Sequence, residues 1–120
     1  MKKLLIVDDE PSFVEVLKAR LEFAGHVVQS AGSGEDALTM VAYDQFDFIL
    51  LDVMMPNVDG YQFLQQLRAN PRTRDIPVIV TTAVPKFRGE KRMESMGVLA
   101  YLEKPFDVAL LLSLIEKTGS

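Results

Sequence analysis

Acidic, hydroxyl and basic residues follow four short apolar segments of this chain. Asp8 and Asp9 come directly after the first of these segments, and Asp52, Thr82 and Lys104 come after three later ones. Carboxylate oxygens are the ligands that a hard cation such as Mg²⁺ takes, and a carboxylate can also accept a phosphoryl group covalently. A hydroxyl and an ammonium group can both contact phosphoryl oxygens. These residue types therefore predict a divalent-metal site beside a phosphoacceptor carboxylate.

Taken singly, each of these residues has a structural explanation. Adjacent aspartates stabilise a helix N-terminus, aspartates are common in turns, and a lone lysine is usually a surface residue. Thr82 suits a strand because it is β-branched, and Thr81 offers the same hydroxyl one residue earlier. Alternate residues of a strand point to opposite faces, so only one of these threonines can point into the site. The combination of five such positions at four strand ends favours the chemical interpretation.

A regular alternation of short apolar and longer amphipathic segments positions these residues. The predicted strands are residues 4–7, 27–28, 48–51, 78–81 and 98–102. Helices are predicted after Pro11, after Ser33, from the Asp59-Gly60 turn, over about residues 86–96, and over residues 106–117. This alternation predicts an α/β fold, a doubly wound parallel sheet of five strands with five helices on its two faces. Ligands bind such a sheet outside the carboxyl ends of its strands, where the polar residues fall.

Local signals mark the helix ends. Pro11 fits a first helical turn, and Gly25 fits a helix stop. Ser33 and Asp36 form a capping-box pattern at the start of the second helix. Residues 86–96 have the weakest helical pattern, which is typical of an element that moves, although a short helix without a role has the same pattern.

The last predicted helix, residues 106–117, is apolar around more than one face. A surface helix normally has a single apolar stripe. We therefore expect Leu110 or Leu114 to be exposed and to contact a second copy or a downstream domain. Deep burial of the whole helix is the alternative.

The composition is that of one globular domain. The chain has 120 residues, of which 48% are apolar, a formal net charge of −4 and no cysteine. We expect one domain over residues 1–120, without disulfides or thiolate chemistry. The acidic balance argues against direct nucleic-acid binding. The apolar segments are too short for a signal peptide or a membrane span, so we expect a cytoplasmic protein that does not bind membranes.

Four motifs resemble those of the receiver domain of bacterial two-component response regulators, and of chemotaxis regulators in particular. They are IVDDE at residues 6–10, LDVMMPNVDG at 51–60, PVIVTTA at 77–83 and YLEKPF at 101–106. The resemblance extends over essentially the whole chain and implies a flavodoxin-like fold with strand order 2-1-3-4-5. It also selects Thr82 over Thr81, because the family places its hydroxyl residue just before an alanine.

This resemblance implies a phosphorylation switch. Asp52 would accept a phosphoryl group from a sensor histidine kinase or a phosphotransfer protein, and Lys104 and Thr82 would bind the phosphoryl oxygens. The implied ligands of Mg²⁺ (or Mn²⁺) are Asp8, Asp9, Asp52 and the backbone carbonyl of Met54.

The resemblance further implies that Thr82 and Tyr101 move on phosphorylation. Their movement would change the surface formed by the fourth helix, the fifth strand and the last helix, through which a homodimer or a partner would be controlled. Met54 and Val84 should flank the phosphoryl group, and neither side chain can orient an attacking water by hydrogen bonding. We therefore expect a regulatory phosphoacceptor domain with slow self-dephosphorylation, not an enzyme acting on a separate substrate.

Three other functions fit the sequence less well. A phosphohydrolase needs a general acid near its nucleophile, and Met54 cannot serve. A nucleotide-binding domain would have a glycine-rich first loop, whereas residues 8–11 are acidic. A receiver that never takes phosphate is disfavoured because all five site residues are present. The kinase, its contact with residues 11–14, an output domain after Ser120 and the isomer of the Lys104-Pro105 bond stay open.

Overall fold

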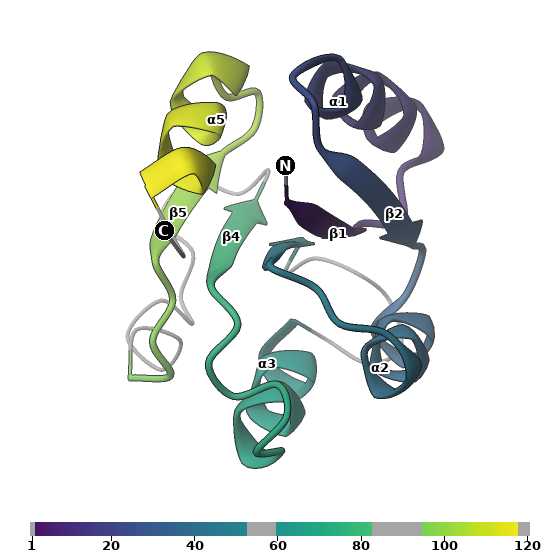
Figure 1. Cartoon of the computed structure of the whole chain (residues 1–120), viewed down its shortest axis with the longest axis vertical. Coiled ribbons are helices and arrows are strands. Elements are labelled where there is room, and N and C mark those ends of the chain that lie inside the picture. The colour runs from purple at the N-terminus through teal and green to yellow at the C-terminus, as the bar shows by residue number, and fades with distance from the viewer. Residues whose placement is uncertain (1, 53–59, 83–94, 118–120) are drawn as a thin grey trace.

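A five-stranded parallel sheet forms the centre of the molecule (Figure 1). The structure, a computed structural model, describes residues 2–52, 60–82 and 95–117. The strands are β1 (Lys3–Val7), β2 (Val27–Ala31), β3 (Phe48–Asp52), β4 (Val78–Thr82) and β5 (Ala100–Glu103). The helices within the described ranges are α1 (Pro11–Phe23), α2 (Gly34–Tyr43), α3 (Gly60–Ala69) and α5 (Val108–Lys117). The strand order β2-β1-β3-β4-β5 confirms the predicted α/β topology.

The helices cover both faces of the sheet, as predicted. On one face, the buried residues of α1 and α5 pack against strand residues that include Leu4, Ile6 and Leu50. On the other face, α2 and α3 pack against the alternate residues, such as Leu5 and Leu51. Because β1, β3 and β4 are buried on both sides, each contains a continuous apolar run, at residues 4–7, 48–51 and 78–80. Most of the predicted fourth helix, residues 86–96, lies outside the described residues.

The two edge strands differ most from the sequence prediction. β2 is longer than the predicted Val27-Val28 and pairs with β1 along its whole length, up to the partners Val7 and Ala31. Its polar residues Gln29 and Ser30 hid this extension, and an edge strand tolerates them because part of it faces solvent. β5 begins two residues later than predicted and ends one residue later.

The helix ends follow the local signals. Gly25 has a positive φ of 100°, which suits a helix stop at a residue without a side chain. The Asp36 N–H donates to Ser33 Oγ over 3.1 Å, which confirms the predicted cap of α2. α5 begins at Val108 instead of residue 106, because Asp107 Oδ1 accepts the Ala109 N–H over 2.9 Å.

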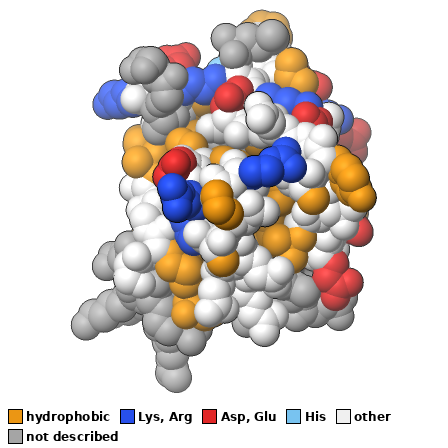
Figure 2. Space-filling view, turned by 60° about the horizontal axis from the view of Figure 1, so that its bottom comes forward, with side chains coloured by type: hydrophobic (Ala, Val, Ile, Leu, Met, Phe, Trp, Pro, Cys, Tyr) orange, Lys and Arg blue, Asp and Glu red, His pale blue; other side chains and the backbone are white. Residues whose placement is uncertain are grey.

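Exposed apolar side chains are scattered over the surface. Leu110 of α5 is 48% exposed, which confirms part of the expectation for the last helix, whereas Leu114 is half-buried. Phe23 at the end of α1 is 95% exposed. On the face shown in Figure 2, apolar side chains lie among interspersed basic and acidic ones.

Arg68 of α3 joins the loops at the amino ends of β4 and β5. Its Nε donates to the Met96 carbonyl over 2.7 Å, and its Nη1 donates to the carbonyls of Arg74 and Ile76 over 2.8 and 2.7 Å. A guanidinium group has five donors in a rigid plane, so it can bind several carbonyls at once. The predicted helical spacing gave no sign of this role.

Candidate functional site

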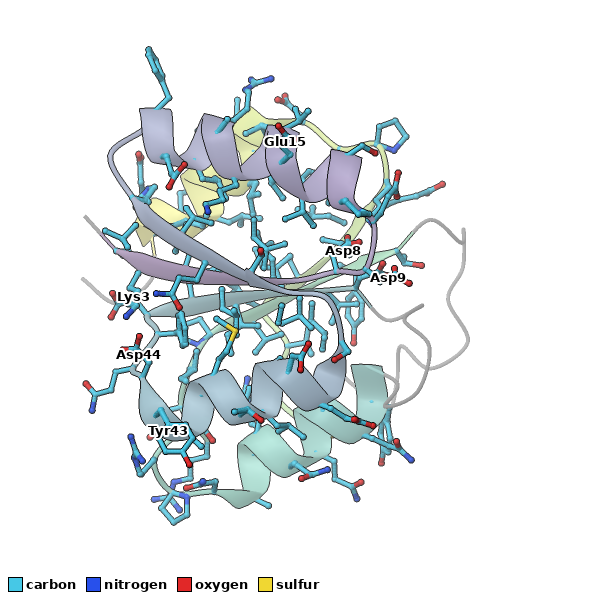
Figure 3. All side chains as sticks on the ribbon, turned by 90° about the vertical axis from the view of Figure 1, so that its right-hand side faces the viewer. Lys3, Asp8, Asp9, Glu15, Tyr43 and Asp44 are labelled. Atoms are coloured by element: carbon cyan, nitrogen blue, oxygen red, sulfur yellow. The ribbon has the colours of Figure 1, made fainter. Side chains whose placement is uncertain are left out.

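Four of the predicted site residues meet at the carboxyl end of the sheet. Asp52 is the last residue of β3, Asp8 and Asp9 follow β1, and Lys104 follows β5. One carboxylate oxygen from each aspartate lies within 4.8 Å of the others. Asp8 and Asp52 are buried, whereas Asp9 is exposed. Figure 3 shows Asp8 and Asp9 at the end of the sheet opposite Lys3 and Asp44.

The backbone around Asp8 fixes its side chain. The Asp8 N–H donates to the Ala31 carbonyl over 3.0 Å, which continues the pairing of β1 and β2 past the strand end. Asp8 Oδ1 accepts the Glu10 N–H over 2.9 Å, a local turn that leads into Pro11 and α1. The other oxygen, Oδ2, therefore faces the site.

Lys104 supplies a positive charge to this site. Its Nζ lies 2.6 Å from Asp8 Oδ2 and 3.3 Å from Asp52 Oδ2. The Lys104 N–H donates to the Thr82 carbonyl over 2.7 Å, which ties it to the end of β4. The Lys104-Pro105 peptide bond is cis, which answers the question that the sequence left open. Burial lowers the pKa of Lys104, but the hydrogen bond to Asp8 and the charge of Asp52 outweigh burial, so this pKa lies above its ordinary value.

The donor set fits a hard divalent cation. Three carboxylates lie together in the described part of the site, and the Lys104 ammonium contacts two of them, so negative charge is in excess. Two of these carboxylates are buried, where mutual repulsion is stronger than in water. Mg²⁺ and Mn²⁺ prefer such oxygen ligands, and the residues present fit either ion. Met54, the other predicted metal ligand, and Val84 lie outside the described residues.

The two threonines at the end of β4 lie on opposite faces of the sheet. Both are buried, and Thr81 pairs with Asp52 while Thr82 pairs with Glu103. By strand alternation, Thr82 belongs to the face of α2 and α3, where Tyr101 packs half-buried. Thr82 thus shares a face with Tyr101, the residue with which the family resemblance pairs it.

The sequence reasoning missed one residue beside the site, Phe13. The Lys104 ammonium lies 4.2 Å from the centre of the Phe13 ring. Phe106 meets that ring edge-on at a centroid distance of 5.9 Å. The position of Phe13 in the helix predicted after Pro11 gives no sign of its contact with Lys104. Its one distinguishing signal is its place in the first turn after the paired aspartates.

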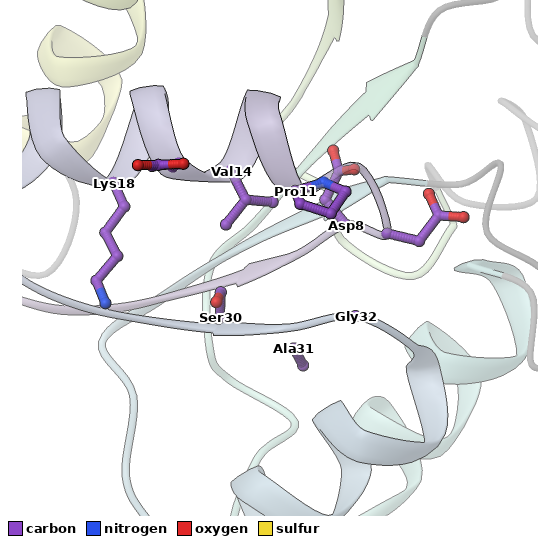
Figure 4. A pocket seen from close by; sticks show the side chains of 9 residues that line it. Asp8, Pro11, Val14, Lys18, Ser30, Ala31 and Gly32 are labelled. Atoms are coloured by element: carbon purple, nitrogen blue, oxygen red, sulfur yellow. The ribbon is translucent and has the colours of Figure 1, made fainter.

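A cleft of about 400 Å³ opens next to the acidic residues (Figure 4). It lies between the first turns of α1 and the end of β2, and Asp8, Pro11, Lys18 and Ser30 are among the residues that line it. The buried Asp8 and the exposed Asp9 are therefore reached from a concave surface.

Comparisons with known proteins agree with this geometry. A family model described as "Response regulator receiver domain" matches residues 4–116. The chain is 38% identical over 115 residues to the DNA-binding dual master transcriptional regulator RpaA of Synechocystis, covering 96% of this chain and 48% of that protein. The chain thus spans about half the length of this curated relative.

Solved structures show the same fold. Vibrio cholerae chemotaxis protein CheY4 has a TM-score of 0.90 at 28% identity, with 99% of both chains covered. Thermotoga maritima response regulator TrrA, in complex with Mg²⁺-BeF, has a TM-score of 0.84 at 30% identity, with 98% of both chains covered. Receiver domains of response regulators are phosphorylated on an aspartate by histidine kinases, and this phosphorylation switches output activity. Both the acidic site and these matches place the chain in one family: it belongs to the response regulator receiver domains.

Proposed function

We propose that Asp52 is the phosphoacceptor of this receiver domain. The observation that carries this proposal is the convergence of Lys104, Asp8 and Asp9 on a carboxylate at the end of a buried strand. Asp8 is the weaker candidate because its Oδ1 accepts the Glu10 N–H and its Oδ2 accepts the shorter of the two Lys104 contacts. Hydrogen bonding of this kind lowers the nucleophilicity of the Asp8 carboxylate. Asp52 has the longer Lys104 contact, 3.3 Å, and its backbone is held by pairing with Thr81 in the sheet.

In the proposed reaction, an Asp52 carboxylate oxygen attacks the phosphorus of a phosphohistidine on a sensor histidine kinase or phosphotransfer protein. The new P–O bond forms as the P–N bond breaks, and the imidazole leaves with the electron pair and takes up a proton. Lys104 balances the negative charge of the phosphoryl oxygens. Asp8, Asp9, Asp52 and the Met54 carbonyl would hold Mg²⁺ or Mn²⁺, which when bound offsets charge on the transferring oxygens.

Thr82 and Tyr101 are proposed to carry the signal away from Asp52. Thr82 ends β4, and Val80 of the same strand pairs with Tyr101 of β5. A shift of Thr82 toward the phosphoryl group would therefore bias the neighbouring strand and the α5 surface beyond it.

The proposed output surface combines residues 86–96, β5 and α5, and the exposure of Leu110 supports it. We propose that phosphorylation promotes a homodimer through this surface. Sedimentation of phosphorylated protein should show a dimer that Leu110→Lys removes. A phosphorylated protein that stays monomeric at high concentration would count against the dimer.

Residues 1–120 are proposed to act as one regulatory domain in the cytoplasm, without binding nucleic acid or membranes themselves. The net charge of −4 supports this proposal, because nucleic acids and many membrane surfaces are anionic. Among the described residues, no helix combines the length and the apolar character needed to cross a membrane. What output the domain controls depends on its partner or on a further domain.

Slow self-dephosphorylation remains a prediction from Met54 and Val84. Their apolar side chains cannot orient water, so the phosphorylated protein should decay slowly. Replacing both with polar residues should speed the decay, and an unchanged decay rate would contradict this role.

Intact mass after incubation with Mg²⁺ and a small acyl-phosphate donor tests the proposed phosphoacceptor. Wild type should gain one phosphoryl group, and Asp52→Asn should gain none. Asp47→Asn is the matched control, because Asp47 accepts the Lys3 N–H over 2.8 Å at the other end of the sheet. This control should react like wild type. An adduct retained in Asp52→Asn would refute the assignment.

A further inference from the structure

The Phe13 ring lies against the ammonium group of Lys104, and the phosphotransfer chemistry does not by itself require such a contact. We propose that Phe13 is a positioning residue for phosphoryl transfer, because its ring holds the Lys104 ammonium between Asp8 and Asp52. This inference rests on the proposed function, in which Lys104 contacts the phosphoryl group.

The contacts of Lys104 Nζ form a three-sided cage. Two sides are the carboxylates of Asp8 and Asp52, at 2.6 and 3.3 Å, and the third is the Phe13 ring, whose centre is 4.2 Å away. An ammonium group within about 6 Å of a ring centre is attracted by the negative face of the ring. The Lys104 side chain is only 12% exposed, so water competes weakly for the ammonium and the attraction is stronger than at the surface.

The ring itself is held from two directions. Phe13 lies in the first turn of α1, which is anchored by the Val14 N–H donating to the Glu10 carbonyl over 3.1 Å. Phe106 packs edge-on against the Phe13 ring with an interplanar angle of 79°, a favourable arrangement for two aromatic rings. Phe106 follows Lys104 by two residues, so the loop that carries the ammonium also braces the ring that receives it.

An uncharged partner matters here because the charged partners change during the reaction. A bound cation and a phosphoryl group on Asp52 both alter the field of the carboxylates that hold Lys104. The quadrupole of the ring is the same in both states, so its attraction for the ammonium persists. Lysine has a flexible four-carbon stem, and a fixed contact limits the positions that its ammonium samples.

Fluorinated phenylalanines at position 13 test this role with little change in side-chain size. One, two and three ring fluorines progressively withdraw electron density from the ring face and weaken its attraction for a cation. With saturating Mg²⁺ and a small acyl-phosphate donor, the rate constant for adduct formation should fall stepwise, by about threefold or more across the series. Phe13→Tyr should keep most of the rate, and Phe13→Leu, which has no ring, should slow adduct formation at least as much as the trifluorinated form.

The same substitutions at Phe23 are the matched control. Phe23 lies on the same helix but is 95% exposed, so its fluorinated forms should react at the wild-type rate. A second measurement uses metal-free protein and needs no activity. Proton NMR should show the Lys104 ε-methylene signals shifted upfield by the ring, and Phe13→Leu should remove that shift.

The outcomes separate this inference from the proposed function. A rate constant that is flat across the fluorine series, in a protein that takes a phosphoryl group on Asp52, would overturn the role of Phe13 and leave the proposed function standing. An unsubstituted protein that takes no phosphoryl group on Asp52 would overturn the proposed function, and the role of Phe13 with it. A stepwise fall at position 13 alone supports both.

Discussion

The two ends of the parallel sheet differ in the balance of their positive and negative side chains. At the amino end, Lys3 pairs with Asp44 (Figure 3), and its Nζ lies 5.2 Å from the centre of the Phe46 ring. Arg68 at the same end donates to backbone carbonyls. At the carboxyl end, Lys104 also has carboxylate and ring partners, but its one ammonium group lies among a cluster of three aspartates, two of which it contacts. One end is balanced by the chain itself, whereas the other has a surplus of negative charge that a cation can balance.

We therefore expect the amino end of the sheet to contribute to stability alone, and the carboxyl end to contribute to metal binding and function. A balanced end gains nothing from a ligand, so its contribution to stability should not depend on metal. An end with excess buried charge is destabilised by repulsion until a cation binds, which links folding to metal binding.

Removing the positive charge at the carboxyl end should have the largest effect on stability. Lys104→Met leaves the buried Asp8 carboxylate without its cation partner, so we expect the free energy of unfolding of metal-free protein to fall by about 4 kcal/mol. Mg²⁺ should restore part of this loss. Urea unfolding with chelator and with Mg²⁺ measures both values. A loss that is the same with and without Mg²⁺ would contradict the contrast.

Removing the guanidinium at the amino end should cost nearly as much, but without dependence on metal. Arg68→Met leaves the carbonyls of Met96, Arg74 and Ile76 without their donor, and we expect a loss of about 3 kcal/mol. Arg72→Met is the control, because the guanidinium of exposed Arg72 donates a single hydrogen bond, to the Ala42 carbonyl, within the described residues. Its loss should stay below about 1 kcal/mol. Rescue of Arg68→Met by Mg²⁺ would show that the two ends are not separate.

Mg²⁺ should stabilise wild type by about 2.7 kcal/mol at one hundred times its dissociation constant. Asp9→Asn removes an exposed carboxylate from the acidic site, so at the same Mg²⁺ concentration most of this gain should disappear. Thermal unfolding over a Mg²⁺ titration measures the effect, with Asp47→Asn as the amino-end control. An Asp9→Asn protein that keeps the full gain would exclude Asp9 as a ligand.

The smallest effect should come from His26 at the amino end. Its Nδ1 accepts the Lys2 N–H over 3.2 Å, and its Nε2 is buried without a partner in the described part of the chain. Burial lowers the pKa of His26 below its ordinary value of 6.5, so the folded protein binds this proton less readily than the unfolded chain. Stability should therefore fall as pH drops through about 6.5.

His26→Gln should remove this acid loss, which we expect to be about 0.5 kcal/mol or less because the imidazole is only partly buried. Urea unfolding at pH 7.5 and pH 5.5 compares the two proteins. Identical pH dependence in both would show that His26 does not titrate differently on folding.

The central strands, which are covered on both faces, were the elements best predicted from the sequence. The apolar segments of β1, β3 and β4 are continuous because both their faces are covered, so strand position and the clustering of Asp8, Asp52 and Lys104 followed directly. β2 was underestimated because a strand at the edge of a sheet contains polar residues.

Contacts that depend on distant loops could not be predicted from spacing. Arg68 binds Met96 across 28 residues, and Phe13 meets Lys104 only after α1 and β5 have packed in the same fold. Helical periodicity places both side chains on a helix face, but it does not identify what they touch.

The most direct test of the account is to locate the phosphoryl group chemically. Borohydride reduces an aspartyl phosphate to homoserine, so peptide mass mapping after phosphorylation by a small acyl phosphate and Mg²⁺ identifies the modified position. The account predicts homoserine in place of Asp52 and at no other aspartate. Homoserine in place of Asp8 or Asp9 would contradict the assigned roles within the carboxyl end. Homoserine in place of Asp47 would contradict the contrast between the two ends of the sheet.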